Sequence, residues 1–266
     1  MAENKPGTAA PGGKHWNANA RDWAEIQERT ARPAWLAVLN ELTPSPGRQL
    51  LDLGCGAGGF ARLAAGRGIR VSGLDTSAAL VAIARTRTSA GTFRVGDMEQ
   101  IPFPDDEFSA VTAFNSLHFA RDPAKVIAEA IRVTRPGGHI AIAAWDPLTD
   151  CDALAYLLDL GGLMPATPRR AQPSPDLTDP ASVRRLLSHA GLTLSPGRTV
   201  ECPWEYPDQE TALRGLLSTG PAAVAIGHAG LARATETITE SISPYRRPDG
   251  SYLLRNTCFT ITATVT

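Results

Sequence analysis

The feature that most constrains this chain is a regular alternation of short apolar runs and helical patterns between residues 48 and 145. The apolar runs lie at 49–53, 70–74, 92–95, 110–114 and 139–144, and the helical patterns lie near 60–65, 77–85 and 123–133. Strand, helix and strand in succession give parallel strands joined by right-handed crossovers. The sequence therefore predicts an α/β fold with a doubly wound, mostly parallel sheet.

The segment before this core reads as a tail followed by helices. Residues 1–14 are rich in Gly, Pro and Ala without periodicity, so we expect a disordered tail. Apolar residues then recur mostly at helical spacing, which predicts N-terminal cap helices within 15–47, with Pro33 separating two of them. Residues 48–266 form the main domain in this interpretation.

Two segments interrupt the regular pattern after residue 145 and predict helical lid insertions. The first, at about 147–180, combines an apolar helix with a proline-rich loop. The second, at about 203–250, is helical and rich in Ala and Leu, and it lies between strands expected at 192–200 and 257–265. Long excursions inside a compact domain usually form lids or binding walls, so we expect both insertions to cover a site.

Composition narrows the class of partner. The chain has 26 basic and 27 acidic residues, which gives no general attraction to nucleic acid or to an anionic membrane. No apolar stretch resembles a signal peptide or a membrane span, and the four cysteines show no metal or redox spacing. Free thiols fit a reducing compartment. We therefore expect a soluble cytoplasmic protein that acts on a small molecule, with its oligomeric state open between monomer and homodimer.

The strongest local signal is the segment LLDLGCGAGG at 50–59, a strand that runs into a glycine turn. Glycines are needed where a turn is tight and a ligand lies against bare backbone. Gly54, Gly56 and Gly59 satisfy a dinucleotide fingerprint, and Asp75 ends the second strand, where an acid that binds ribose hydroxyls belongs. Asp75 could instead cap the next helix. Beside the glycine loop we favour ribose binding, which a nicotinamide enzyme and a methyltransferase both need.

Three features favour a methyl donor over a dinucleotide. Asp52 lies at a strand end, where an acid is costly unless it anchors the loop or meets an ammonium group, and a pyrophosphate would repel it. Asp97 and Met98 follow the third strand, where the carboxylate could accept from an adenine amino group while Met98 packs on the ring; capping a turn is an equal alternative for Asp97. Finally, RPGG at 135–138 predicts a tight turn before the fifth strand.

Taken together, these motifs resemble the class I S-adenosylmethionine-dependent methyltransferases of the small-molecule, UbiE-like bacterial type. The resemblance spans about 48–145 and rests on the segments LLDLGCGAGGFARLA, VSGLD, GDMEQIPFPDDEFSAV, FNSLHFARDP and RVTRPGGHIAIAAW. It implies a Rossmann-like sheet with an antiparallel last strand. It also implies transfer of a methyl group from S-adenosyl-L-methionine to a nitrogen, oxygen or carbon atom of a small molecule.

The same resemblance implies roles for individual residues. Asp52, Gly54 and Gly56 would contact the methionine end of the cofactor, and Asp75 would bind the ribose. Asp97 and Met98 would contact the adenine, and the backbone of Asn115 would lie near the sulfonium. Cys55, Thr76 and Trp23 complete the expected cofactor-binding set. One departure is Ser109 after Phe108, where the family often has an aspartate; it affects a loop contact and no cofactor contact.

Methyl transfer by in-line displacement mainly requires alignment of nucleophile and methyl and exclusion of water. His118 is the candidate catalytic base, because it follows the fourth strand and a histidine titrates near neutral pH; the alternative is a histidine that shapes the pocket wall. Cover for the pocket could come from aromatic residues, or these could be ordinary core: Trp16, Trp23, Tyr156, Trp204 and Tyr206. The acidic run at 105–107 reads as a solvated turn, so no metal is expected.

The same motifs are compatible with two other functions. The glycine pattern and Asp75 alone would also suit an NAD(P)-dependent oxidoreductase. A protein of the same fold could also bind the cofactor without catalysis. The acceptor itself is not specified by these motifs, because substrate choice resides in the lids.

Overall fold

The structure is a computed structural model, and it describes residues 13–43, 45–146, 151–164 and 176–266. Within these residues one sheet has eight strands, with β7 (Arg198–Glu201) pairing with β10 beside the main path. The main path runs in the order β3 (Thr92–Val95), β2 (Arg70–Asp75), β1 (Gln49–Leu53), β4 (Phe108–Phe114), β5 (Thr134–Trp145), β10 (Thr257–Thr264) and β6 (Thr193–Leu194). Strands β1 to β5 are parallel and β10 is antiparallel to β5, which confirms the predicted sheet.

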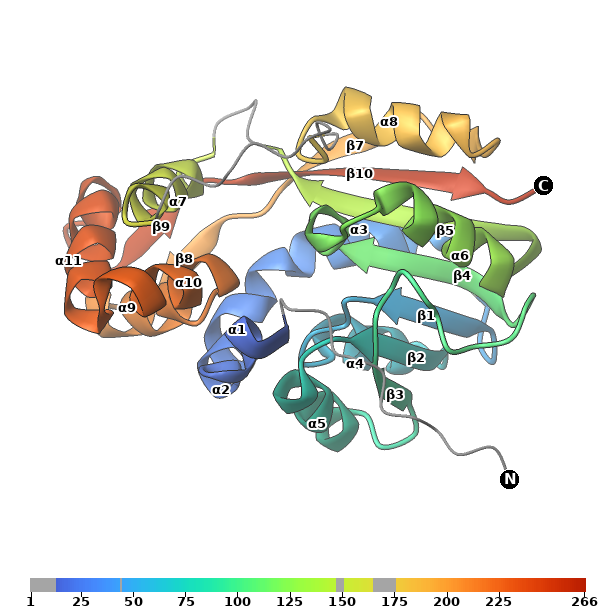
Figure 1. Ribbon diagram of the computed structural model, residues 1–266, viewed down its shortest axis with the longest axis horizontal. Coiled ribbons are helices and arrows are strands. Elements are labelled where there is room, and N and C mark those ends of the chain that lie inside the picture. Colours follow the sequence, from blue (N-terminus) through green and yellow to red (C-terminus); the bar gives the residue numbers. More distant parts are fainter. Residues whose placement is uncertain (1–12, 44, 147–150, 165–175) are drawn as a thin grey trace.

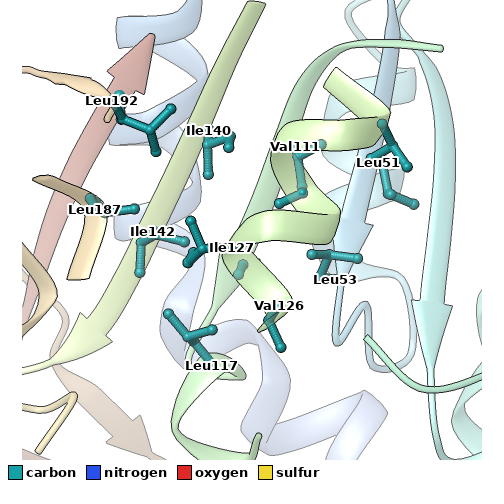
Figure 2. Packing of buried hydrophobic residues seen from close by; sticks show 14 of the residues in the cluster. Leu51, Leu53, Val111, Leu117, Val126, Ile127, Ile140, Ile142, Leu187 and Leu192 are labelled. Atoms are coloured by element: carbon teal, nitrogen blue, oxygen red, sulfur yellow. The ribbon is translucent and has the colours of Figure 1, made fainter. Parts of the chain in front are cut away.

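Helices cover both faces of this sheet, because side chains alternate between its faces along each strand. On one face lie α6 (Pro123–Val133) and α8 (Pro180–His189), and on the other lie α3 (Arg32–Leu42), α4 (Gly59–Ala65) and α5 (Ala78–Arg87). Figure 2 shows Val126 of α6 near Leu53 of β1 and Ile127 of α6 beside Ile142 of β5, whereas Leu50 faces the other cluster. Two hydrophobic cores thus sandwich the sheet and fix where its strands end.

A second group of helices stands beside the sheet, at the left of Figure 1. It comprises α7 (Ala153–Gly162), α9 (Gln209–Leu217), α10 (Gly220–Ala229), α11 (Leu231–Ile242) and a 3₁₀ turn at Ser243–Tyr245. A short antiparallel ribbon of β8 (Trp204–Tyr206) and β9 (Tyr252–Leu254) closes it. These elements share their own apolar core, which includes Tyr156, Leu160 and Ile238. Helix α7 of the first segment expected to form a lid therefore packs together with the helices and ribbon of the second.

The N-terminal cap connects the two groups. It runs through α1 (Gly13–Asn17), α2 (Ala20–Asp22), a π-helical turn at Trp23–Gln27 and a 3₁₀ turn at Glu28–Ala31 before α3 begins. In Figure 1, α1 and α2 lie between the lid helices and α5, and α1 contacts both α10 and α5. Isolated π-helical turns are frequent at functional sites.

Several boundaries differ from the sequence predictions. Helix α1 already begins at Gly13, so the expected tail cannot extend to residue 14; residues 1–12 and most of the proline-rich loop lie outside the described residues. The RPGG segment at 135–138 is part of β5 and not a turn before it. The pairing of β4 with β5 shifts register at this point, and Gly137 adopts φ +74°.

The strand expected at 192–200 is broken into β6 and β7. Gly197 lies between them with φ +67°, a conformation that interrupts a regular ladder. The β8–β9 ribbon was not predicted from the helical composition of its surroundings. No helix in the described part of the chain is long and apolar enough to cross a membrane.

Candidate active site

A cavity of about 660 Å³ opens where the parallel strands end, between the sheet, the N-terminal cap and the lid helices. This volume is typical of pockets that hold small molecules and cofactors. All eleven residues predicted to bind cofactor or to act in catalysis line this cavity: Trp23, Asp52, Gly54, Cys55, Gly56, Asp75, Thr76, Asp97, Met98, Asn115 and His118. Residues from five separate stretches of sequence meet there because parallel strands bring their carboxyl ends to one edge.

The glycine loop between β1 and α4 has no room for side chains at its two key positions. Gly54 and Gly56 adopt φ +72° and +53°, which L side chains rarely do. A Cβ at Gly54 would lie 2.3 Å from Cβ of Ser116. At Gly56 a Cβ would lie 2.9 Å from Oε1 of Glu28 and 3.4 Å from Nε1 of Trp23. The loop therefore presents bare backbone to the cavity.

Asp75 both holds this loop and faces the cavity. Its Oδ2 accepts a hydrogen bond from the backbone N–H of Gly56 at 2.9 Å, and its Oδ1 accepts one from the N–H of Ser77 at 2.8 Å. A carboxylate offers about four acceptor positions, so each oxygen keeps a further lone pair. Asp75 can therefore hold the backbone of the loop and line the ligand site at the same time.

Asp52 is a buried acid, with only 3% of its surface exposed. The hydroxyl of Thr112 donates to its Oδ1 at 2.8 Å. Burial, with smaller contributions from the nearby charges of Glu28 and Asp75, raises the pKa of Asp52 to about 8, and the hydrogen bond from Thr112 opposes the shift. A cation brought to this side chain would stabilise the ionised form, which otherwise is poorly solvated.

Glu28 is a site residue that sequence reasoning missed. Its Oε1 accepts a hydrogen bond from the backbone N–H of Ala57 at 2.7 Å, and its Oε2 pairs with Nη1 of Arg87 at 2.7 Å. Burial raises the pKa of Glu28 to about 7, although Arg87 opposes the shift. In the sequence, Glu28 lies among charged residues of a helical stretch and carries no signal that distinguishes it from a solvated one.

At the far end of the cavity, Asp97 and Met98 follow β3. Oδ1 of Asp97 accepts a hydrogen bond from the N–H of Glu99 at 2.9 Å, which is the turn-capping arrangement considered for it. Its Oδ2 lies 4.0 Å from Nη2 of Arg121, an exposed side chain. Met98 is partly buried against the core below α6. Asp97 thus caps its turn and lines the cavity at once.

The segment after β4 is held in an unusual conformation. Asn115 adopts φ +50°, and its N–H donates to the carbonyl of Ala143 at 2.8 Å. The next hydroxyl, that of Ser116, donates to the carbonyl of Leu53 at 2.7 Å. Oδ1 of Asn115 is buried without a hydrogen-bond partner. A buried unpaired acceptor beside the cavity is a position where a ligand donor fits.

His118 follows in a 3₁₀ turn at Leu117–Phe119, and its ring lies 4.1 Å from that of Phe119 between centroids. His118 is exposed to solvent on one side, and desolvation by the neighbouring atoms on the other lowers its pKa to about 4, a shift that the charge of Asp176 only partly opposes. The expectation that this histidine titrates near neutrality is therefore wrong. At pH 7 the imidazole is neutral and weakly basic.

Aromatic side chains form much of the remaining wall. Trp16, Trp23, Tyr156 and Trp204 line the cavity as considered, whereas Tyr206 does not. Tyr206 is buried in the lid core, and its hydroxyl donates to Oε1 of Gln27 at 2.7 Å. Further aromatic wall residues were not predicted: Trp35, Phe60, Phe114, Phe119 and Trp145. Their positions depend on packing between distant segments.

Cys202, Cys258 and the acidic turn at 105–107 do not line the cavity, whereas Cys55 and Cys151 do. All four cysteines are free thiols, and Cys202 and Cys258, far apart in sequence, hydrogen-bond to each other through their side chains. Asp105 in the acidic run pairs with Nη1 of Arg132 at 2.7 Å. Among the described residues, no group of three or more His, Cys, Asp and Glu side chains could hold a metal ion.

The cavity fits a nucleotide cofactor that carries a positively charged amino-acid end. The Gly56 backbone leaves space that a Cβ would fill, buried acids surround it, and Nε1 of Trp23 is buried there without a partner. An unpaired donor beside a close backbone approach can meet a carboxylate, and Asp52 can meet an ammonium group. The strand order and this site together define a Rossmann-like cofactor-binding protein.

Comparison with known proteins identifies the family to which this cofactor-binding protein belongs. A family model described as a methyltransferase domain matches residues 51–142. The chain is 31% identical over 186 residues to a ubiquinone biosynthesis O-methyltransferase from Thiobacillus denitrificans, covering 66% of this chain and 77% of that protein. The YcgJ protein from Bacillus subtilis has a similar fold, with a TM-score of 0.60, 18% identity, and coverage of 87% and 97%. The chain belongs to the class I S-adenosylmethionine-dependent methyltransferase family.

A third relative is more similar over a shorter stretch. The chain is 42% identical over 95 residues to a malonyl-[acyl-carrier protein] O-methyltransferase from Serratia marcescens, which covers 36% of this chain and 37% of that protein. The match thus spans little more than a third of this relative. The matching domain model and both of these O-methyltransferases lend no support to the oxidoreductase alternative.

Proposed function

We propose that this protein transfers a methyl group from S-adenosyl-L-methionine to a nitrogen, oxygen or carbon atom of a small molecule. The observation that carries the proposal is the single cavity in which the glycine loop and its acids meet an aromatic lid wall. One end of such a cavity suits a charged nucleotide cofactor and the other suits a second, less polar molecule. Family membership supports the same activity.

In this proposal the cofactor-binding residues divide by position. Asp52, Gly54, Cys55 and Gly56 hold the methionine end, with Trp23 above the loop and Glu28 fixing it. Asp75 and Thr76 hold the ribose, and Asp97 and Met98 hold the adenine. The backbone of Asn115 lies beside the sulfonium. All of these residues line the cavity, which is the support for the assignment.

The bound cofactor supplies an activated methyl group on a sulfonium. The protein's own contribution is to align the acceptor and to keep water out, which the apolar lid wall favours. Because the imidazole of His118 is neutral at pH 7, it can accept a hydrogen bond from the acceptor. We propose that His118 shapes the wall and orients the acceptor. Four free cysteines fit a cytoplasmic location as part of this proposal.

Calorimetric titration of the purified protein with S-adenosylhomocysteine and with NAD tests the cofactor. We expect micromolar binding of S-adenosylhomocysteine and no measurable binding of NAD; the reverse result would refute the proposal. Turnover of the methyl donor with a panel of phenols, enols and amines then tests catalysis. Cofactor binding without turnover on any acceptor class would favour a protein that binds the cofactor but does not catalyse transfer.

The role of His118 predicts a small effect on catalysis. With a pKa of about 4, the imidazole is too weak a base at pH 7 to give the roughly 10²–10⁴-fold contribution of a general base. We therefore expect His118→Asn to lower kcat by less than about tenfold and to act mainly on the acceptor KM. The wild-type profile of kcat should show no inflection from this residue between pH 6 and 8. A loss of 100-fold or more in kcat would restore the base assignment.

The raised pKa values predict how cofactor affinity depends on pH. The pKa is about 8 for Asp52 and about 7 for Glu28 in the free protein, so both are largely protonated at pH 6. An ammonium group binds the ionised form, so affinity for S-adenosylhomocysteine should fall roughly 10- to 50-fold from pH 8 to pH 6. Calorimetry at several pH values measures this.

The control is Asp52→Asn, which should bind more weakly at pH 8 and show a flatter pH dependence. The stability of the free protein should move the other way. Because the folded pKa of both acids lies above the unfolded value, their contribution to stability is present at low pH and is lost as pH rises toward 8. Affinity that is constant from pH 6 to 8 would contradict the role of Asp52.

A further inference from the structure

The part of the cavity wall that comes from the lid differs sharply from the part near the glycine loop. The lid wall is made of Leu154, Tyr156 and Leu157 from α7, Pro221 from α10 and Trp204 from β8. Trp204 packs against Trp145 with ring centroids 5.3 Å apart and against Tyr156 at 6.1 Å. This wall presents flat rings and aliphatic groups, which favour contact with another ring.

A second aromatic group continues this surface from the N-terminal cap. Trp16 contacts Trp23 with ring centroids 4.7 Å apart and Phe119 at 5.8 Å, both in edge-to-face arrangements. All three side chains line the same cavity. Because α1 contacts α10, the cap and the lid border one space rather than two. The acceptor region is thus bounded by aromatic rings from both segments.

Charged side chains are distributed unevenly around the cavity. Its acids come from the cap, from the ends of β1 and β2 and from the loop after β3: Glu28, Asp52, Asp75, Asp97 and Glu99. Among the described lining residues, no Asp, Glu, Lys or Arg comes from the lid helices or from β8. The lining arginine, Arg121, is exposed and lies 4.0 Å from Asp97. Against the described residues of the lid wall, an anionic acceptor would lose its hydration without meeting a cation.

The lid wall also contains a polar atom without a hydrogen-bond partner, besides the hydroxyl groups of Tyr156 and Thr219. Nε1 of the Trp204 indole is buried without a hydrogen-bond partner, and 4% of this side chain is exposed. Buried donors are usually paired, so this N–H is a candidate to bind an oxygen of the acceptor. A carbonyl or hydroxyl oxygen on an otherwise apolar ring satisfies both the donor and the surrounding rings.

We propose that the methyl acceptor is a neutral, ring-bearing molecule with an oxygen substituent, held between the aromatic walls of the lid and the cap. The inference rests on the proposed function and adds the substrate class to it. It excludes acceptors that must enter the lid region as carboxylates, phosphates or ammonium ions. Selectivity against charged acceptors then comes from the lack of an opposite charge in the described lid wall as much as from attractive contacts with neutral ones.

Three probes that share one ring system test the proposal: 2-naphthol, 2-naphthoate and 2-naphthylmethylammonium. Each is titrated into the protein saturated with S-adenosylhomocysteine, and binding is followed by calorimetry and by tryptophan fluorescence. We expect 2-naphthol to bind at least about tenfold more tightly than either charged probe. Equal or tighter binding of the carboxylate or the ammonium probe, or binding of none at millimolar concentration, overturns the proposal.

A charge placed in the lid wall should change this order. Leu157 is half-buried on the cavity side of α7, and Leu158, the next residue, is 65% exposed and does not line the cavity. We expect Leu157→Lys to tighten 2-naphthoate relative to 2-naphthol by at least about tenfold. The matched control Leu158→Lys should keep the wild-type order. Leu154→Lys, on the same half-buried face, replaces Leu157→Lys if that variant does not fold.

The hydrogen-bond part of the proposal has its own variant. Trp204→Phe keeps an aromatic ring but removes the indole N–H, and it should weaken 2-naphthol by roughly 2- to 10-fold while leaving naphthalene binding nearly unchanged. An equal loss for both ligands would remove Trp204 as a donor. If S-adenosylhomocysteine binds normally while the probes fail, only this inference is wrong. If S-adenosylhomocysteine itself does not bind, the proposed function is wrong.

Discussion

Replacing Gly56 by valine should weaken binding of S-adenosylhomocysteine by on the order of 100-fold or more, while the protein stays folded. Any Cβ at this position lies 2.9 Å from Oε1 of Glu28 and 3.4 Å from Nε1 of Trp23, and a branched side chain extends further into the cavity. The side chain must therefore occupy space that the proposed cofactor needs against the backbone. Calorimetry measures the affinity, and a thermal melt verifies the fold.

A matched control separates the clash from backbone strain. Gly47 also adopts a positive φ, +80°, but a Cβ there would meet nothing within 4 Å, and Gly47 does not line the cavity. Gly47→Val should thus share a strain cost of about 1–2 kcal/mol and keep the wild-type affinity. Normal binding by Gly56→Val, or an equal loss of binding in both variants, would mean that the loop does not hold the cofactor as proposed.

Replacing Glu28 by alanine should lower the free energy of unfolding by about 2–4 kcal/mol at pH 6, below the folded pKa of about 7, because the contribution of this acid to stability is lost as pH rises through that value. The side chain is 7% exposed, and its loss leaves the N–H of Ala57 and the guanidinium of Arg87 without their partner. Arg87 is 24% exposed and also donates to the carbonyl of Ala24, so the cost stays below that of a fully buried pair. Urea denaturation measures the change.

Two further variants define what Glu28 contributes. Glu28→Gln keeps an oxygen that can accept from Ala57 and should cost less, about 1–2 kcal/mol. Glu25→Ala, at an exposed position in the same cap, should change stability by less than about 0.5 kcal/mol. Cofactor affinity should fall in Glu28→Ala because the glycine loop loses its tie to the cap. If Glu28→Ala behaves like Glu25→Ala, the ion pair with Arg87 does not stabilise the fold.

Much of the central fold follows from local patterns. The bounds of β1, β3 and α6 agree with the sequence predictions, because hydrophobic periodicity and capping residues act within a few positions of each other. Asp122 illustrates this, since it caps α6 by accepting from the N–H of Lys125 at 3.2 Å. Local patterns failed where a glycine interrupts a ladder, as at Gly197. There, pairing with a distant strand decides the outcome.

The candidate cofactor site could also be located from the sequence, for a topological reason. Asp52, Asp75 and Asp97 each follow or end a strand, and parallel strands deliver their carboxyl ends to a common edge. Predicting the strands therefore predicted the neighbourhood of these acids. The hydrogen-bond partners of these acids could not be predicted from the strand pattern. That Asp75 ties together the N–H groups of Gly56 and Ser77 depends on the conformation of the loop.

Tertiary packing alone decided the chemistry of several groups. Glu28 reaches Ala57 across 29 positions, and its pKa rises to about 7 only because the cap buries it on the glycine loop. Desolvation by neighbouring segments lowers the pKa of His118 to about 4, although part of this side chain is exposed. The acceptor wall likewise forms only when α7, β8 and the cap meet. Residue type and periodicity act locally and specify strands, helices and strand ends, whereas burial and charge environment arise from contacts between distant segments.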